Sequence, residues 1–481
     1  MNILQAMRDP KLFGGIFKES LDGKDTWAAW RAFLAALFGL PLEGEALELC
    51  QKHTGRADVP GVPFREAFVV CGRRAGKSIL AAFVAVYLAC FRDYSEILAP
   101  GEGGVVMLLA SDRRQARVLL GYVNGFFDKI PLLAGMVAAR RSEAILLTNG
   151  LRLEIHTSDF RAVRGFTIIA AVADEISFWP TDNAASPDTE ILAALRPGMA
   201  SVPGALLLAI SSPYARRGAL WEAWREYFGK ADAPCLVWQG ATREMNPTIS
   251  PAIIERAYAS DPASAAAEYG AQFRTDVENF IPLEVVEARV VPGRFELPPA
   301  PGATYSAFVD PSGGSHDSFT LGIAHAERET AVLDLLREVK PPFSPENVVA
   351  EFCVDLKRYR VGTVVGDRYG GEWPREQFRK QGIEYKPSEK TKSELYLDLL
   401  PALNSAQVEL LDNARLLAQL RSLERRTSRA GRDSVDHPPG AHDDLANSAG
   451  GALVLALQRG WGVLHVPMLL PSPGYWCSLR N

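Results

Sequence analysis

The first half of the chain alternates short apolar runs with polar or glycine-bearing loops and stretches of helical length. Continuous apolar runs of this kind are typical of parallel strands that are covered on both faces. Five candidate strands occupy residues 67–71, 105–110, 151–156, 168–173 and 205–210. This pattern predicts an α/β domain with a mostly parallel sheet, in which the loops after the strands carry the active site.

The second half has a different order of elements, which begins with three closely spaced strand-like runs, as in an antiparallel meander. The expected elements are strands at 304–309, 318–324 and 330–336, a helix at 345–359, a fourth strand at 362–366 and a final helix at 443–457. This order predicts a second α/β domain built on a mixed sheet.

Proline and glycine pairs separate the two patterns and predict a linker. The expected organisation is a first domain at 1–278, a linker at 279–303, a second domain at 304–458 and a tail at 459–481, which matches no recognised pattern.

Charge and cysteine content narrow the class of protein. The 52 Lys and Arg residues nearly balance the 57 Asp and Glu residues, so contact with nucleic acid must use local basic patches. The six cysteines are dispersed without a C-x-x-C pair, which argues against a zinc ribbon or a disulfide scaffold and fits a reducing cytoplasm. We expect no signal peptide, and the longest apolar stretch (79–91) is too short to span a bilayer.

A glycine-bearing loop follows the first candidate strand and precedes an apolar helical run. In a phosphate-binding loop, backbone N–H groups cradle the phosphates, the lysine (Lys77) reaches the β- and γ-phosphates, and the hydroxyl (Ser78) ligates Mg²⁺. Cys71 stands where the strict motif has glycine, and an ordinary strand-to-helix turn with a solvated lysine is the alternative interpretation. The predicted ATP-binding residues of the loop are Gly72, Arg73, Arg74, Ala75, Gly76, Lys77 and Ser78.

The fourth candidate strand ends in two acidic residues, Asp174 and Glu175. In phosphate-loop ATPases the aspartate at this place holds Mg²⁺ and the following glutamate orients and deprotonates the attacking water. Adjacent acids at a strand end are also common in solvated turns, but the upstream loop favours ATP hydrolysis. The fifth strand ends in Ser211-Ser212-Pro213, which we interpret as an element that couples the γ-phosphate to the rest of a motor, or else as a helix cap or bend.

Four aspartates in the second half lie where a two-metal site needs them. Asp310 ends the first strand of the meander, Asp367 follows the fourth strand, and Asp443 and Asp444 open the last helix. Ribonuclease-H-like folds project carboxylates from these three places, and such oxygen ligands hold two Mg²⁺ or Mn²⁺ ions about 4 Å apart that cleave a phosphodiester. Helix capping is the alternative explanation for the aspartates at the helix start. We predict a metal-dependent nuclease site.

Two further features stay open. Asp317 fits an accessory ligand or a turn residue, and His442 fits an orienting residue for a metal-ligating carboxylate or a plain helix-entry residue. An upstream basic segment is predicted to bind the phosphate backbone of DNA, or else to form a solvated helix face balanced by Glu424 and Asp433. Its candidate DNA-binding residues are Arg421, Arg425, Arg426 and Arg429.

Together these features resemble the large terminase subunit of tailed bacteriophages, over residues 27–457. The residues that carry the resemblance are the loop 72–78, Arg164-Gly165, Asp174-Glu175, Ser211-Ser212-Pro213, and the stretches 268–273 and 440–444. The resemblance implies a P-loop ATPase domain of the RecA-like (ASCE) type joined to a ribonuclease-H-like nuclease domain. It implies ATP-driven translocation of double-stranded DNA into a procapsid, with endonucleolytic cuts, and it implies ATP and Mg²⁺ as cofactors, with Mn²⁺ able to substitute. The implied partners are the portal protein, the small terminase subunit and further copies of the chain in a ring, expected to be a pentamer, in the host cytoplasm.

Arg164 is the candidate arginine finger, because it precedes the acidic strand and lies beside Gly165, which frees the loop to move. Arg161, Arg73 and Arg74 are the alternatives.

The chain departs from the family pattern at Cys71 and at Asn447, where many relatives have an aspartate. Of Asp443 and Asp444, we favour Asp444 as the main ligand. A DNA helicase or repair ATPase with a fused nuclease is the alternative function, although the chain has no second RecA-like block. A structural protein of the capsid or tail would have no use for both acidic sets.

Overall fold

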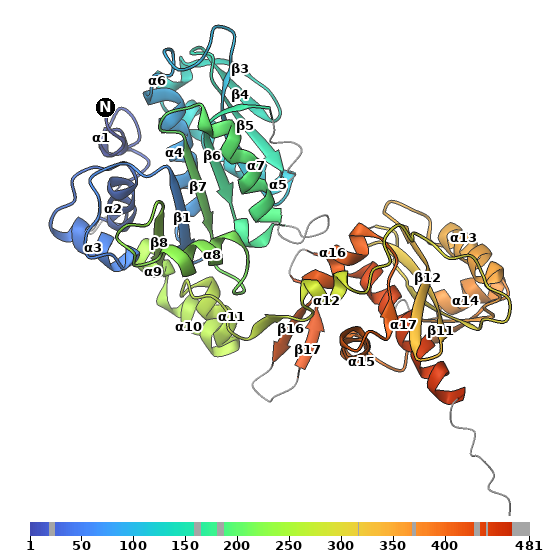
Figure 1. The fold of residues 1–481 in the computed structure, drawn as a ribbon. Helices are drawn as coiled ribbons and strands as arrows, with labels where there is room; N and C mark the ends of the chain where they lie inside the picture. The colour runs from blue at the N-terminus through green and yellow to red at the C-terminus, as the bar shows by residue number, and fades with distance from the viewer. Residues whose placement is uncertain are drawn as a thin grey trace, which may run out of the picture. The chain divides into compact units, whose positions relative to one another are not determined.

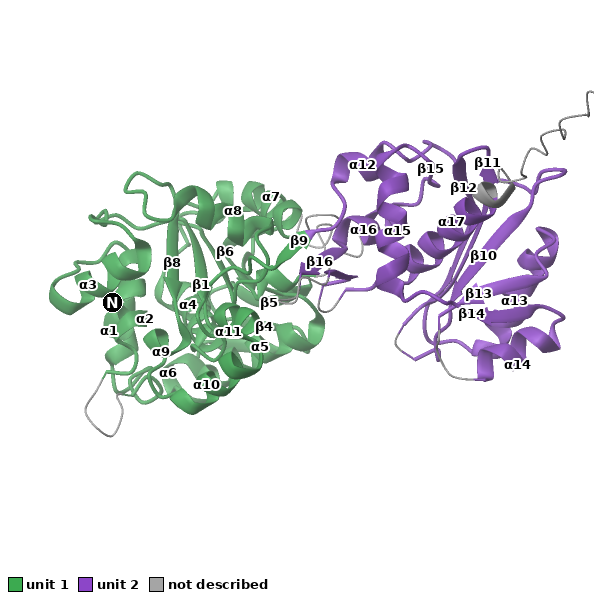
Figure 2. Ribbon diagram, turned by 90° about the horizontal axis from the view of Figure 1, so that it is seen from below, with its two compact units in different colours: residues 1–278 green, residues 279–481 purple. Residues whose placement is uncertain are grey.

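The computed structural model describes residues 1–18, 25–157, 165–179, 187–315, 317–367, 372–427, 433–438 and 441–463. The chain divides into two compact units, Met1–Glu278 and Asn279–Asn481, which Figure 2 draws in green and purple. None of the helices in the described ranges combines the length and the apolar character that a membrane-spanning helix needs.

Unit 1 is built on an eight-stranded sheet with the order β3-β4-β5-β2-β6-β7-β1-β8. Six strands are parallel, and β3 and β4 add an antiparallel edge. The strands are β1 Glu66–Cys71, β2 Gly104–Ala110, β3 Val137–Arg140, β4 Ala144–Leu147, β5 Arg152–Thr157, β6 Thr167–Asp174, β7 Leu206–Ser211 and β8 Leu236–Gly240. The five strands predicted from the sequence are confirmed as β1, β2, β5, β6 and β7. Every residue of β2 and β7 is buried, as expected for strands covered on both faces.

Helices surround this sheet (Figure 1), and buried residues of most of them form one core with the strands. They are α1 Ile3–Arg8, α2 Ala28–Leu37, α3 Gly44–Thr54, α4 Lys77–Phe91, α5 Arg113–Lys129, α6 Pro131–Ala134, α7 Pro187–Ala200, α8 Gly218–Tyr227, α9 Thr242–Met245, α10 Pro251–Ser260, α11 Pro262–Glu268 and the 3₁₀ turn Ile176–Phe178. Because β6, β7 and β1 are neighbours and parallel, their carboxyl ends meet at one edge of the sheet.

Unit 2 is built on a six-stranded mixed sheet with the order β14-β13-β10-β11-β12-β15. The antiparallel meander β10-β11-β12 is followed by β13, which pairs with β10 in parallel. The strands are β10 Tyr305–Asp310, β11 Phe319–Glu327, β12 Thr330–Val339, β13 Thr363–Gly366, β14 Glu384–Pro387 and β15 Val408–Glu409. A separate hairpin joins β16 Glu424–Thr427 to β17 Asp433–Asp436, and β9 Val277–Asn279 lies at the boundary of the units. The predicted fold class, α/β with a mostly parallel and a mixed sheet, is confirmed.

The period of two along β10 assigns its side chains to two different cores. Ala307 and Val309 belong to one core, with residues of α13 Pro345–Arg358 and α14 Trp373–Lys380. Phe308 belongs to the other, with residues of α12 Leu283–Glu287, α15 Lys392–Asn404, α16 Ala414–Ser422 and α17 Asp444–Val463. Asp310 comes two residues after Phe308, so the strand presents it on the face that α17 covers.

The segment 279–303, for which composition predicts a linker, is part of unit 2. It contains α12, and Phe280, Ile281 and Val286 are buried in the core shared with α15, α16 and α17. The side chains of this segment that pack into the core are apolar residues that lie among the prolines without a regular period.

A buried ion pair joins two strands of the unit 2 meander. His325 Nδ1 on β11 lies 2.7 Å from Asp334 Oδ2 on β12, and both residues are buried. The hydrogen bond to Asp334 raises the pKa of His325, and burial raises the pKa of Asp334. Both shifts mean that the folded state holds protons more tightly than the unfolded chain.

We therefore expect the free energy of unfolding of unit 2 to fall as pH rises. The contribution of the raised His325 pKa is complete below the usual value of 6.5 and is lost as pH rises through the folded value. His325→Asn keeps a donor near Asp334 without a titrating ring, so it should weaken the pH dependence above pH 6.5. Urea titrations at several pH values between 6 and 9 measure this, and an unchanged slope in the variant would refute it.

Candidate functional site

The glycine-bearing loop connects the end of β1 to the start of α4. Gly76 has φ 94°, a left-handed conformation that favours glycine and lets the chain turn directly into the helix. Lys77 is 5% exposed, and its Nζ lies 2.7 Å from Ser212 Oγ and 3.4 Å from the carbonyl oxygens of Cys71 and Gly72. Its ammonium group is therefore held between the start of the loop and Ser212. Cys71 is the last residue of β1, and burial raises the pKa of its thiol to about 12, so it behaves there as a small apolar residue.

Ser78 and Asp174 meet at the end of β6. The Ser78 hydroxyl donates to Asp174 Oδ2 over 3.0 Å. Burial, and next the charge of Glu175, raise the pKa of Asp174 to about 6. A buried carboxylate beside a hydroxyl, with Asp174 Oδ1 unpaired among the described residues, fits the oxygen ligands that Mg²⁺ requires.

Glu175 links the acidic strand end to the serine turn after β7. Its backbone has φ 49°, an uncommon conformation for a residue other than glycine and one that occurs at functional sites. Its Oε2 accepts hydrogen bonds from Ser211 Oγ (3.1 Å) and from the Ser212 backbone N–H (3.2 Å), and its Oε1 lies 3.3 Å from Lys77 Nζ. Ser211 and Ser212, which precede Pro213, thus contact both the acid and the lysine.

Four residues distant in sequence hold the loop. The sequence patterns gave this role to none of them, although Glu268 belongs to the stretch 268–273 that carries the resemblance. Trp30 Nε1 donates to Ala75 O (2.8 Å), Thr242 Oγ1 donates to Arg73 O (2.8 Å), and Asn246 Nδ2 donates to Arg74 O (2.9 Å). The Arg73 guanidinium lies 3.0 Å from Glu268 Oε1. The candidate arginine fingers Arg164 and Arg161 lie outside the described residues.

We expect Glu175→Gln to bind ATP but to hydrolyse it about 10²–10⁴-fold more slowly, as is typical when a general base is removed. The amide keeps an acceptor for Ser211 and Ser212 and loses the proton-accepting charge. Steady-state ATPase assays beside nucleotide-binding titrations measure this, with Glu255→Gln on the exposed face of α10 as the control. Loss of binding with normal turnover per bound ATP would assign Glu175 another role.

The second group of acids gathers where β10, β13 and α17 meet. Asn447 Nδ2 donates to Asp310 Oδ2 (2.8 Å) and to Asp367 Oδ2 (2.7 Å). A Cβ at Gly451 would lie 2.3 Å from the Phe308 ring, so only glycine lets α17 approach β10 this closely. The sequence predicted that Asp310 and Asp367 belong to one site. It noted Asn447 only as a departure from the family pattern, at a position where many relatives have an aspartate, and did not predict its contact with both carboxylates.

The surroundings of Asp310 and Asp367 disfavour charge without a cation. Burial, and next the charge of Asp367, hold the pKa of Asp310 well above its usual range. Burial also raises the pKa of Asp367. Two carboxylate oxygens within 2.8 Å of one amide nitrogen can both reach a single divalent cation, so these residues fit Mg²⁺ or Mn²⁺.

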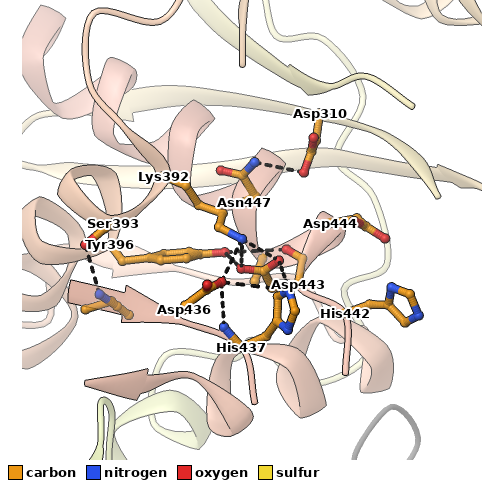
Figure 3. Close-up of polar contacts among 12 residues, drawn as sticks. Asp310, Lys392, Ser393, Tyr396, Asp436, His437, His442, Asp443, Asp444 and Asn447 are labelled. Atoms are coloured by element: carbon orange, nitrogen blue, oxygen red, sulfur yellow. Dashed lines mark hydrogen bonds and ion pairs between the residues drawn. The ribbon is translucent and has the colours of Figure 1, made fainter. Parts of the chain in front are cut away.

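Asp443 has a different set of contacts (Figure 3). Its carboxylate accepts from Tyr396 Oη (2.9 Å) and lies 3.0 Å from Lys392 Nζ, which is also 2.9 Å from Asp436 Oδ1. Asp436, His437 and Asp443 bring one potential ligand atom each within 4.8 Å of one another. The Lys392 ammonium already supplies a positive charge to the carboxylates of Asp436 and Asp443, in the place of a cation.

Asp444 is the first residue of α17 and lies apart from the Lys392 group in Figure 3. Its Oδ2 accepts from the Ser318 backbone N–H (3.2 Å), and burial raises its pKa to about 6. Nearby, His442 Nδ1 lies 3.5 Å from Asp317 Oδ1, so the structure brings together the two residues that the sequence left open.

The basic segment differs from the helix face that was one interpretation of it. Arg421 lies near the end of α16, whereas Arg425 and Arg426 lie on β16. Arg425 Nε donates to Asp433 Oδ2 (2.9 Å), and Arg426 lies 3.3 Å from Glu424 Oε2. Arg429 lies outside the described residues. DNA binding by this segment stays a prediction.

No protein-family model matches the chain, and neither does any curated protein. Solved structures that resemble it over most of its length are bacteriophage large terminases. The large terminase of bacteriophage HK97 is 16% identical with a TM-score of 0.35, covering 82% of this chain and 91% of its own. A large terminase from a thermophilic bacteriophage is 12% identical with a TM-score of 0.38, covering 90% and 99%. The large terminase nuclease from thermophilic phage G20c, with bound magnesium, is 20% identical with a TM-score of 0.32, covering 36% and 95%. Identities and TM-scores this low carry no conclusion about activity, which must come from the side chains of this chain.

Proposed function

We propose that this chain is the large subunit of a viral terminase, a motor that hydrolyses ATP to move double-stranded DNA into a procapsid and cuts it with a metal-dependent nuclease. The observation that carries the proposal is the presence of two separate acidic sites in one chain. Unit 1 brings Lys77 and Ser78 to Asp174 and Glu175, and unit 2 brings Asp310 to Asp367.

In the proposed ATPase site, Lys77 meets the β- and γ-phosphates and Ser78 and Asp174 hold Mg²⁺. Glu175 orients the attacking water and accepts its proton. Ser211 and Ser212 bond Glu175 and Lys77, so a shift of either group on hydrolysis changes contacts at the end of β7. This is the step by which hydrolysis is passed to the rest of the motor. Arg164 is proposed to stabilise the charge on the γ-phosphate.

In the proposed nuclease site, Asp310, Asp367 and Asp444 are the acidic residues that bind Mg²⁺ or Mn²⁺, which supply charge stabilisation to the cleaved phosphodiester when bound. Asp443 is the weaker candidate ligand, because its carboxylate is already engaged by Lys392 and Tyr396. Arg421, Arg425, Arg426 and Arg429 are proposed to contact the DNA backbone. The proposed partners are double-stranded DNA, the portal protein, the small terminase subunit, the procapsid and further copies of the chain in a pentameric ring, in the host cytoplasm.

The test is a paired assay on the full chain: ATPase activity with and without double-stranded DNA, and nicking of plasmid in Mn²⁺. DNA-stimulated ATPase together with nicking supports the proposal, and the absence of both would favour a structural protein. A helicase or repair ATPase with a fused nuclease is the competing function. Strand-displacement assays and stimulation by portal-bearing procapsids separate the two, because only a terminase responds to the procapsid.

A further inference from the structure

Asn447 is the one side chain in the described ranges that bonds both Asp310 and Asp367. Its Nδ2 group donates one hydrogen to each, over 2.8 and 2.7 Å, and the residue is completely buried. Its Oδ1 is buried too and has no hydrogen-bond partner among the described residues. The amide therefore uses its donor end fully and its acceptor end not at all.

This arrangement suits a site without a cation. An ionised carboxylate can accept hydrogen bonds but cannot donate them. A group that lies between two ionised carboxylates must therefore present donors. The NH₂ end of an amide does this, whereas its carbonyl oxygen would be repelled. A divalent cation in the same gap reverses the requirement, because it attracts oxygen ligands and repels N–H groups.

A side-chain amide meets both requirements by rotating about its Cβ–Cγ bond, which exchanges the nitrogen and the oxygen. One end of the amide lacks a partner among the described residues in the orientation seen here, and one end lacks a partner after rotation. The free-energy cost of leaving one end of the amide without a partner is therefore similar in the two orientations. The rotation replaces two N–H donors that face the carboxylates by one oxygen that can bind the cation.

We propose that Asn447 is an oxygen ligand of the nuclease cation, and that its amide rotates about the Cβ–Cγ bond when Mg²⁺ or Mn²⁺ enters between Asp310 and Asp367. This inference rests on the proposed nuclease function and extends its ligand set to a neutral residue. A carbonyl oxygen adds a ligand without a further negative charge between the carboxylates of Asp310 and Asp367. The site is therefore less strained when empty, and it binds its cation less tightly, than a site with an aspartate at position 447 would, because ligand charge tunes affinity.

The competing role is that of a spacer, in which the amide only keeps the empty carboxylates apart from one another and leaves when the cation binds. The two roles predict opposite effects of removing the amide. A ligand lost from the shell lowers metal affinity, whereas a competitor removed from the gap raises it.

The experiment is calorimetric titration of the full chain with Mn²⁺, without nucleotide, for wild type and four variants. Asp310→Asn defines the binding that belongs to the nuclease site, since Mn²⁺ at Ser78 and Asp174 is unaffected by it. Asn447→Leu keeps the approximate volume without the amide, and Asn447→Asp adds a charge. Gln458→Leu, on an exposed position of the same helix, is the matched control.

We expect Asn447→Leu to weaken the Asp310-dependent Mn²⁺ affinity by about tenfold or more, the size typical of lost residues around a metal. Asn447→Asp should strengthen it and lower the melting temperature of the metal-free protein, and Gln458→Leu should change neither. Equal or tighter binding by Asn447→Leu would overturn the ligand role. If Asn447→Leu does not fold, Asn447→Ala removes the amide without adding charge or bulk and decides between the two roles, and equal or tighter Mn²⁺ binding by that variant would overturn the ligand role.

The failure of this inference is distinguishable from failure of the proposed function. If wild type shows no Mn²⁺ binding that Asp310→Asn removes, the nuclease site itself is wrong. If that binding is present and Asn447→Leu retains it in full, the nuclease site stands and only the role of Asn447 is lost.

Discussion

Lys77→Ala should abolish ATP hydrolysis while plasmid cutting by the same chain continues. Lys77 is buried at the loop and lies within 3.4 Å of Ser212 Oγ, Glu175 Oε1 and two loop carbonyl oxygens, so its ammonium has a fixed position. Loss of one preorganised charge-stabilising group typically reduces the rate about 10²–10³-fold, and loss of phosphate binding adds to this. The nuclease residues belong to the other unit, so their activity should persist.

ATPase and plasmid-nicking assays on one preparation measure both effects. Lys230→Ala, at an exposed position after α8, is the control for loss of a lysine. A thermal melt of Lys77→Ala shows whether the variant is folded, which matters because the substitution leaves Glu175 without its cation. ATP turnover at the wild-type rate would remove the phosphate-loop assignment.

Asp310→Asn should remove nuclease activity and leave ATPase activity unchanged. Charge stabilisation by a bound metal contributes several kcal/mol to a transition state, so its loss should reduce cutting at least about 10²-fold. Asp367→Asn should do the same, and the double variant should be little worse than either, because residues that act as one unit are not additive. Full cutting by either single variant would leave only the ATPase part of the proposal.

The same variant should change the response of the protein to metal. The pKa of Asp310 is raised in the folded state, so ionised Asp310 opposes folding at neutral pH. Asp310→Asn removes that opposition, and the metal-free melting temperature should equal or exceed that of wild type. Mn²⁺ stabilises only the folded site, so its stabilising effect should shrink in the variant. Thermal melts with and without Mn²⁺ measure both, with exposed Asp398→Asn on α15 as the control.

Local pattern was sufficient for the meander of unit 2 and for every parallel strand of unit 1 except β8, which the sequence did not predict. A strand that is buried on both faces has a short continuous run of apolar residues, and such a run can be recognised in the sequence without knowledge of the neighbouring strands. The edge strand β3, with the burial pattern of a mostly exposed segment, and the short strand β15 carry no such signal. They depend on pairing partners that the sequence does not name.

The contacts that hold the phosphate loop could not be predicted from the sequence, because they join residues far apart along the chain. Trp30, Thr242, Asn246 and Glu268 lie 45 to 195 residues from their partners in the loop. Each is an ordinary residue in its local context. Only the fold, which brings α2, α9 and α11 to the loop, gives it a role.

The amino-acid sequence by itself determined where each acidic residue stands on its element: Asp174 at the end of β6, Asp310 at the end of β10, and Asp367 just after β13. Strand ends are set by local composition, and the parallel order brings such ends to one edge. The tertiary structure alone decided which side chain of α17 lies between Asp310 and Asp367. Asp444 and Asn447 occupy different angles around α17, and Asp443 is the residue that precedes this helix. With α17 close to β10 at Gly451, Asn447 contacts both carboxylates, while Asp443 contacts Lys392. The rotation of a helix about its axis depends on packing against its neighbours, and no spacing within the sequence specifies it.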